Sequence, residues 1–295
     1  MPRLLALLGV LSISFSAVFI RLASVSPVTA VFFRAAYAVP LLIALWLWQR
    51  SADHRDRRSR WLAFASGIVL ATDLACWHES IALVGAGLGT VIANVQVVFI
   101  ALFGWLAHGE RPTGRTTVIL LAVLAGIALT SGLARHDAYG AAPVLGVLFG
   151  VAAGGFYAAY LVMFRAANRS GAPRSGPLLE STVGMAVGAL AVAVIDPHFS
   201  LVPTWPSHGW LLALAIVSQI LGWLLIVNAL ASLPPLETSI LLLVQPVFAI
   251  VWSRLIFDEH MSPLQWAGTL LVLIGVATVS SGRTTENVGT RRRTA

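Results

Sequence analysis

The feature that most constrains this chain is the series of long apolar segments along its whole length. A transmembrane helix needs about 20 mainly apolar residues, and cutting the sequence at charged, proline and glycine clusters leaves ten such segments. They are residues 4–22, 28–49, 61–83, 86–107, 116–134, 143–165, 177–195, 208–231, 236–257 and 263–281. Charged residues make up 11% of the chain, against about 25% in soluble domains. The sequence therefore predicts an all-α membrane protein with ten transmembrane helices and short loops.

The basic residues indicate how the chain is oriented. All of the 19 basic residues are arginines, and cytoplasmic loops of membrane proteins carry an excess of positive charge. With the N-terminus in the cytoplasm, most of them lie on that side, namely Arg3, Arg50, Arg55, Arg57, Arg58, Arg60, Arg111, Arg115, Arg165, Arg169, Arg174, Arg283, Arg291, Arg292 and Arg293. The outer ends hold Arg21, Arg135 and Arg254, and Arg34 lies inside a span. We expect a multi-pass protein of the cell inner membrane with both termini cytoplasmic.

An internal repeat relates the two halves of the chain. The stretch VQVVFIALFGWLAHGERP, from Val95, resembles VQPVFAIVWSRLIFDEHM, from Val244, without a gap. The same offset pairs Trp61 with Trp210. Each half has five spans, an odd number, so the second half enters the membrane the opposite way round. We predict two inverted five-helix repeats around a central cavity, an organisation typical of secondary transporters. The predicted units are residues 1–136, 137–282 and a disordered basic tail, 283–295.

The ordered set of these features resembles the EamA family, the ten-helix branch of the drug/metabolite transporter superfamily. The resemblance rests on the ten spans, the repeat, Arg34 in SPVTAVFFRAAYA, and the glutamates of GERPTG and DEHMSP that close the fourth and ninth spans. It implies a cavity walled mainly by spans 1, 3, 4, 6, 8 and 9. It also implies transport, often export, of amino acids or other small metabolites.

Charged residues inside the spans are the first candidates for function. A charge at the bilayer centre costs about 2.5–3.5 kcal/mol, so it persists where it faces a cavity or a partner. Asp73 is at the middle of the third span, and Glu79 is about 9 Å nearer the outside. Arg34 enters the second span from the outside at a depth similar to that of Glu79. We expect Arg34 and Glu79 to form a structural or gating ion pair.

Asp73 has no obvious basic partner at its depth in the sequence. We expect it to bind a substrate or a proton, the alternative being a hydrogen bond to a neighbouring helix. Trp77 follows one turn later on the same face. An aromatic ring beside a carboxylate is suited to binding an amine. The alternative for Trp77 is ordinary packing, which is equally consistent with the sequence. His78 points about 100° away from Trp77, and we expect a structural role for this lone histidine.

Several uncharged polar or aromatic residues reach the middle of other spans. The further candidates for the substrate site are Ser14, Gln96, Tyr157, Gln219, Trp223 and Gln245. Gln96 and Gln245 are mates in the repeat, so both should approach the pseudo-twofold axis. Hydrogen bonding between helices is the alternative role for these side chains. We expect Glu110 and Glu259 to cap the loops that begin the fifth and tenth spans.

The same residues argue against other classes of function. An integral-membrane enzyme acting on a lipid or small molecule is the main alternative, but the metalloprotease motif HExxH and the hydrolase motif GxSxG are absent. Nothing resembles a channel filter or a ring of like charges. We expect a secondary transporter, not an enzyme, that moves amino acids or related amphipathic amines by alternating access. Its partners would be the substrate and the bilayer, with no nucleic acid, metal or cofactor, in a monomer or homodimer.

Overall fold

The computed structural model describes residues 2–109, 111–130, 139–168, 175–202, 204–230 and 235–291. Throughout these ranges the regular structure is helical, and no strand occurs in them. The helices are α1 (Pro2–Ser14), α2 (Ser16–Ala23), α3 (Pro27–Gln49), α4 (Arg57–Val84), α5 (Ala86–Ala93), α6 (Gln96–His108), α7 (Gly114–Thr130), α8 (Pro143–Ala167), α9 (Ser175–Ala193), α10 (Ser207–Ala213), α11 (Trp223–Leu230), α12 (Pro235–Phe257) and α13 (Pro263–Arg291). A short 3-10 turn, η1 (Arg50–Ala52), follows α3, and a π-helical segment, η2 (Leu214–Gly222), joins α10 to α11.

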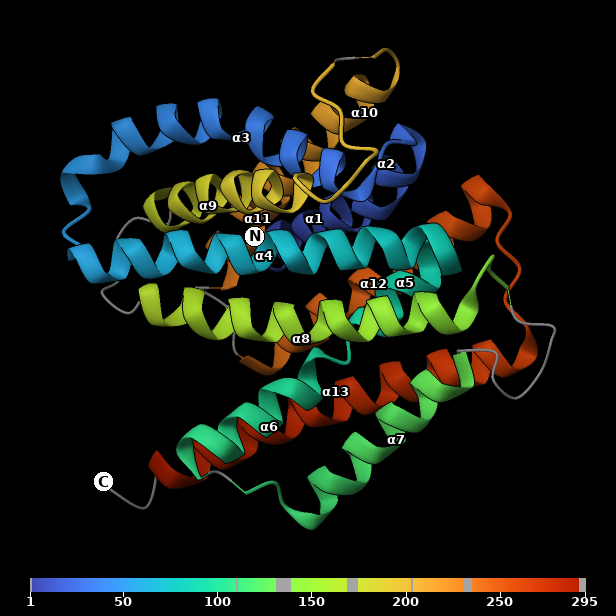
Figure 1. Ribbon diagram of the computed structural model, residues 1–295. Helices are drawn as coiled ribbons and strands as arrows, with labels where there is room; N and C mark the ends of the chain where they lie inside the picture. Colours follow the sequence, from blue (N-terminus) through green and yellow to red (C-terminus); the bar gives the residue numbers. More distant parts are fainter. Residues whose placement is uncertain are drawn as a thin grey trace.

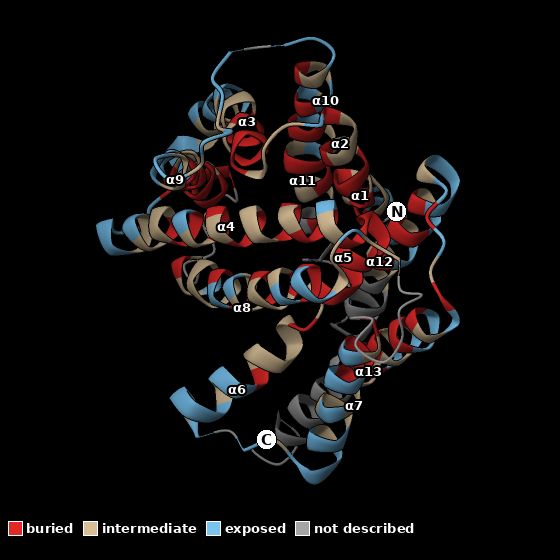
Figure 2. Cartoon of the chain, turned by 45° about the vertical axis from the view of Figure 1, so that its right-hand side comes forward, coloured by how far each residue is buried: buried red, intermediate tan, exposed pale blue. Residues whose placement is uncertain are grey.

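Among the described residues, seven helical segments are long and apolar enough to cross a membrane. Three shorter apolar helices, Gly114–Thr130, Val244–Phe257 and Pro263–Thr278, coincide with the fifth, ninth and tenth predicted spans. Many large apolar side chains remain exposed, such as Leu148 at 61% and Ile274 at 63%. In Figure 2 the buried residues lie on the helix faces that turn toward other helices. Exposed apolar surface of this extent fits contact with lipid rather than with water.

Local sequence sets where the long helices begin. The hydroxyl oxygen of Ser26 accepts a hydrogen bond from the backbone N–H of Thr29, 3.2 Å away, and Pro27 occupies the first turn of α3. The Asp56 carboxylate accepts from the N–H of Ser59 at 3.1 Å and caps α4. Each cap satisfies a backbone donor that the first turn of a helix leaves free.

The helices pack as long neighbouring rods. Helix α4 lies against both α8 and α9, and α7 lies along α13 (Figure 1). Small residues allow the closest approaches, because a Cβ added at Gly67 of α4 would lie 1.8 Å from the carbonyl oxygen of Ser181 on α9. Similarly, a Cβ at Gly126 of α7 would lie 2.7 Å from the carbonyl oxygen of Gly268 on α13. These contacts bury the small-residue faces between helices, as membrane helix packing favours.

Within the described residues, three of the spans are irregular near their middles. The first is interrupted at Phe15, between α1 and α2, and the fourth is interrupted at Asn94 and Val95, between α5 and α6. The eighth widens into the π-helical segment η2. Apolar composition does not distinguish these interruptions from regular helix, so the sequence predicted continuous spans.

The last helix extends beyond the predicted end of the tenth span. Helix α13 (Pro263–Arg291) includes residues 283–291, the last described residues of the chain. No proline follows Pro263 in this part of the sequence, and the polar residues present there are compatible with helix. Loss of apolar character marked the end of the span, which is not the same as the end of the helix.

Candidate functional site

Arg34 lies in the interior of the protein, although it sits on a helix that composition assigns to the membrane. It is 5% exposed on α3, and its Nε donates a hydrogen bond to Oε1 of Gln219 at 2.7 Å. Gln219 is 2% exposed and belongs to the π-helical segment η2. Segments of π-helix often occur at functional sites. The contact joins the second and eighth predicted spans.

Asp73 faces the same interior region from α4. It is 5% exposed, and its charge and that of Arg34 interact electrostatically. The two groups are not in direct contact, since no guanidinium nitrogen lies within 4.0 Å of a carboxylate oxygen. Within the described residues, the Asp73 carboxylate has no hydrogen-bond or ion-pair partner. Arg34 is nevertheless near enough for its charge to act on Asp73, and the sequence did not indicate this neighbour.

The predicted pair of Arg34 and Glu79 does not form between these two described side chains. Glu79 is only half-buried, and its carboxylate interacts electrostatically with the thiol of Cys76. Depth was estimated from position along the helix, which fixes height but not direction around the axis. Six residues at about 100° each place Glu79 some 120° around α4 from Asp73. Arg34 meets the face that carries Asp73 instead.

Two tyrosines of α8 complete the polar cluster. Tyr157 and Tyr160 both interact electrostatically with Arg34 and Asp73, and their rings stack with centroids 5.7 Å apart. Tyr157 was predicted from its depth, whereas Tyr160, only 1% exposed, was missed. The signal for Tyr160 was its spacing of three residues from Tyr157, which puts both on one helix face. We call Arg34, Asp73, Tyr157, Tyr160 and Gln219 the polar cluster.

Trp77 and His78 lie next to this cluster on α4. Trp77 is 8% exposed and packs within the apolar core that also contains Tyr160. The Nδ1 atom of His78 is 3.3 Å from the carbonyl oxygen of Pro27, while its Nε2 atom is buried without a described partner. Its contact with Pro27 joins α4 to the start of α3. The structural role expected for His78 thus has one supporting bond.

The other predicted residues are distributed over several places. Ser14 is 2% exposed and accepts a hydrogen bond from Nε1 of Trp252 on α12 at 2.9 Å. Trp223 packs against a second apolar group that includes Leu42. Gln96 begins α6, and its Oε1 atom is buried without a partner among the described residues. Gln245 is half-buried in α12. No hydrogen bond or ring contact joins these four residues to the polar cluster in the described structure.

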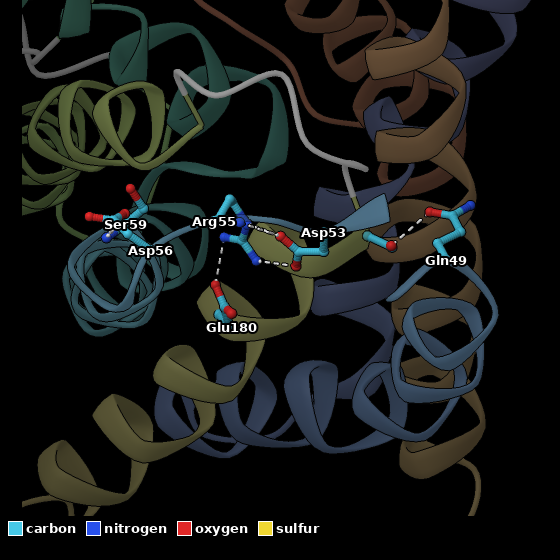
Figure 3. A network of polar contacts seen from close by, with 7 residues as sticks. Gln49, Asp53, Arg55, Asp56, Ser59 and Glu180 are labelled. Carbon is cyan, nitrogen blue, oxygen red and sulfur yellow. Dashed lines mark hydrogen bonds and ion pairs between the residues drawn. The ribbon is translucent and has the colours of Figure 1, made fainter. Parts of the chain in front are cut away.

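A second buried arginine, which the sequence placed only in a basic loop, lies at one end of the helices. Arg55 donates from Nε and Nη2 to the two carboxylate oxygens of Asp53, both at 2.9 Å, and from Nη1 to Glu180 at 2.7 Å (Figure 3). The hydrogen bonds from Arg55 hold the pKa of the Asp53 carboxyl below its ordinary value. We call Asp53, Arg55 and Glu180 the loop triad. It fastens the loop before α4 to α9.

Glu259 caps a different helix from the one expected. Its carboxylate accepts from the backbone N–H groups of Ala86 at 2.9 Å and Gly87 at 3.3 Å, at the N-terminus of α5, and it pairs with Arg21. Gly85 precedes α5 with a φ of 87°, and a Cβ there would lie 2.7 Å from the carboxylate. The prediction that Glu259 caps the start of the tenth span was wrong. It assumed that the carboxylate would cap the next helix along the chain, whereas the fold places the N-terminus of α5 beside it. Its repeat mate Glu110 lies outside the described residues.

A cavity of about 430 Å³ opens at the end of α4. Its lining residues are Arg21, Ile81, Ala82, Leu83, Gly85, Tyr139, Gly140 and Ala141.

Nowhere in the described ranges do three His, Cys, Asp or Glu side chains gather as metal ligands. The described chemistry at the polar cluster is therefore that of a guanidinium, a carboxylate, an amide and two phenols. Such a set can bind charged and hydrogen-bonding groups of a solute.

Comparison with known proteins agrees with this description. The chain is 26% identical over 256 residues to the threonine/homoserine exporter RhtA of Escherichia coli, covering 85% of this chain and 79% of that one. It is 26% identical over 251 residues to the pseudopaline exporter CntI of Pseudomonas aeruginosa, covering 85% and 84%. It is 23% identical over 246 residues to the uncharacterized transporter YwfM of Bacillus subtilis, covering 82% and 79%.

A solved crystal structure has the same fold, with a TM-score of 0.61 and 19% identity over 97% of this chain and 98% of the other. Residues 2–132 and 144–281 each match one and the same protein family. Together with the apolar helices, this match makes the chain a multi-pass membrane protein. The chain belongs to the EamA-like transporter family.

Proposed function

We propose that this protein is a secondary transporter that exports amino acids or related amphipathic amines by alternating access. The observation that carries the proposal is the polar cluster, in which Arg34 and Asp73 are buried inside apolar helices without full pairing. Charged groups at such depth are costly and mark solute pathways. The relatives RhtA and CntI, named as exporters, support the direction of transport.

The helix contacts support the two inverted repeats. Under the predicted repeat, α3 corresponds to α9, α5 to α12, and α7 to α13, and each of these pairs is in contact. Helices that lie on either side of a pseudo-twofold axis would be expected to meet in this way. The contact between α4 and α8 likewise has its counterpart in the contact of α11 and η2 with α1. The two segments that match the family lie on either side of the predicted boundary at residue 136.

The interrupted helices support a central binding region between the halves. Ser14 ends α1, Gln96 begins α6, and Gln219 lies in the π-helical segment, so three predicted site residues are at irregular positions of their spans. Transporters place substrate sites at interrupted helices, where backbone groups become free to bind. In this proposal the cavity forms between the repeats, and movement of one repeat against the other exposes it to each side in turn.

The arginine distribution supports an inner-membrane protein with both termini in the cytoplasm. Single cysteines introduced at Ser51 or Arg283 in a Cys76→Ala background test this orientation. We expect both to resist a membrane-impermeant maleimide added outside intact cells and to react after the membrane is opened. A cysteine at Arg254, on the predicted outer side, serves as the labelled control. Ready labelling at Ser51 or Arg283 from outside would reverse the orientation.

Transport itself is tested in proteoliposomes. Vesicles containing the purified protein are loaded with unlabelled L-threonine or L-homoserine, and entry of the same labelled amino acid is measured by exchange. We expect saturable exchange above that of protein-free vesicles, with the amino acid recovered chemically unchanged. Conversion of the amino acid would favour a membrane enzyme, and a rate that never saturates would favour a channel.

A further inference from the structure

We propose that Arg34 binds the carboxylate of the substrate and Asp73 binds its amine, so that the substrate class is a zwitterion carrying both groups. This inference rests on the proposed transport function and assigns the chemistry of its site. Neither residue type alone indicates this class. The geometry points to it because the two opposite charges face one buried region and do not touch.

Arg34 has hydrogen-bonding capacity that the described structure does not use. Its Nε is bonded to Gln219, but Nη1 is buried without a partner. A buried donor without a partner costs about 1–3 kcal/mol, and more for a charged group. Such groups in native proteins are explained by a bound water, ion or ligand. A carboxylate is the natural partner, because its two oxygens match the planar guanidinium.

Among the described residues, Asp73 lacks hydrogen-bond donors, just as Nη1 of Arg34 lacks an acceptor. Its carboxylate has no hydrogen bond or ion pair within the described residues, although it is 5% exposed. If Arg34 and Asp73 were a purely structural pair, their charged atoms would be expected to meet, since attraction is strong in a buried environment. They remain more than 4.0 Å apart. A ligand ammonium at Asp73 would supply the missing donors.

The balance of charge selects the class of ligand. A purely cationic solute would satisfy Asp73 and leave the guanidinium of Arg34 unpaired, and a purely anionic solute would do the reverse. Leaving one partner of a buried ionic group uncompensated is strongly unfavourable. A zwitterion satisfies both groups without adding net charge. The stacked rings of Tyr157 and Tyr160 provide an aromatic surface beside these groups for the rest of the solute.

The first test uses the wild-type protein, so it does not depend on how a variant folds. Exchange of labelled L-threonine is inhibited with unlabelled L-threonine, with its methyl ester, which lacks the carboxylate, or with N-acetyl-L-threonine, which lacks the amine charge. We expect each analogue to inhibit at least tenfold more weakly than threonine. If either analogue inhibits as well as threonine, the inference is wrong while the transport function stands. If no exchange of threonine or homoserine occurs, the proposed function fails first.

The second test asks whether each charge is read by the predicted residue. In Arg34→Gln the disadvantage of the methyl ester should shrink to less than threefold, while that of the N-acetyl analogue is kept. In Asp73→Asn the pattern should be the reverse. A merely structural role would weaken all three inhibitors equally, which would contradict the assignment. Arg254→Gln and Asp258→Asn remove an exposed ion pair of 2.8 Å and are the matched controls.

Discussion

Among the described residues, two arginines are buried, and their surroundings differ sharply. Arg55, near the start of α4, uses three nitrogens in bonds to the carboxylates of Asp53 and Glu180. Arg34, within α3, has a single bond to the neutral amide of Gln219, and its Nη1 atom has no described partner. Both side chains are removed from solvent, so burial alone does not distinguish them. The two arginines differ in how many of their guanidinium nitrogens have partners. This difference indicates a structural role for Arg55 and a binding role for Arg34.

The difference has a physical basis. A buried charge whose bonds are all made inside the protein gives rigidity and leaves nothing for a ligand. A buried charge with unused donors is costly in the empty protein, and a ligand that supplies the missing acceptor recovers that cost on binding. Substitutions at the two places should therefore affect different measurements.

The largest effect is expected from Arg55→Gln. The substitution leaves Asp53 and Glu180 as buried or half-buried carboxylates without their cation, and breaking such a group costs about 3–5 kcal/mol. The free energy of unfolding in detergent, or the thermal midpoint, should fall accordingly. Arg57→Gln, at an exposed neighbouring position, is the control and should change little. Equal stability of the two variants would show that the loop triad is not structural.

Asp73→Asn should produce the next largest effect, on transport rather than on stability. The amide keeps the shape of the side chain and removes its charge, so exchange of L-threonine should fall more than tenfold, about 1.4 kcal/mol or more. Expression and thermal midpoint should remain close to those of the wild type. Normal exchange would mean that Asp73 serves only in helix packing. Asp258→Asn, on an exposed carboxylate, provides the comparison.

Acid should weaken the loop triad through Asp53. Its pKa is lowered in the folded protein by the bonds from Arg55, so the ionised form stabilises the fold at pH values above its ordinary pKa of 3.8. This contribution is lost as the pH falls below 3.8 and through the lower pKa of the folded state. Asp53→Asn should be less stable than the wild type near pH 7, and the difference should shrink in acid. A difference independent of pH would contradict this account.

The smallest effect is expected at a hydroxyl whose bonding is complete. Ser14→Ala removes the acceptor of the Trp252 Nε1–H, which is 2.9 Å from the serine oxygen. The expected loss in the free energy of unfolding is about 0.5–1.5 kcal/mol. Ser12→Ala is matched, because the one bond of the Ser12 hydroxyl within the described residues goes to the Leu8 carbonyl of its own helix. A larger loss in Ser12→Ala than in Ser14→Ala would show that the α1–α12 bond carries no stability.

The sequence predicted the helical fold because composition and periodicity determine which segments are apolar enough to cross a bilayer. It also predicted that Asp73, Tyr157 and Gln219 would lie deep, since depth follows from position along a span. It did not predict which of them face one another. Direction around the axis depends on helix packing, so Arg34 was assigned to Glu79 instead of to Gln219 and Asp73.

Features that depend on contacts between distant segments were also beyond the sequence. The bond from Glu259 to the start of α5 joins residues more than 170 positions apart. The π-helical segment at Gln219 contains no proline, and its apolar composition does not distinguish it from ordinary helix. Arg55 was counted only as one charge of a basic loop, because its partner Glu180 lies in another predicted span. In each case the tertiary fold, not local propensity, creates the feature.

The central claim, that incomplete pairing marks the binding arginine, is tested most directly by comparing Arg34→Gln with Arg55→Gln in one experiment. Exchange of L-threonine per folded molecule and the thermal midpoint are measured for both. We expect Arg34→Gln to lose at least tenfold in exchange with a midpoint near that of the wild type. Arg55→Gln should lose midpoint, while its folded fraction exchanges within about threefold of the wild-type rate. If the two variants lose exchange and midpoint in the same proportion, the claim is contradicted.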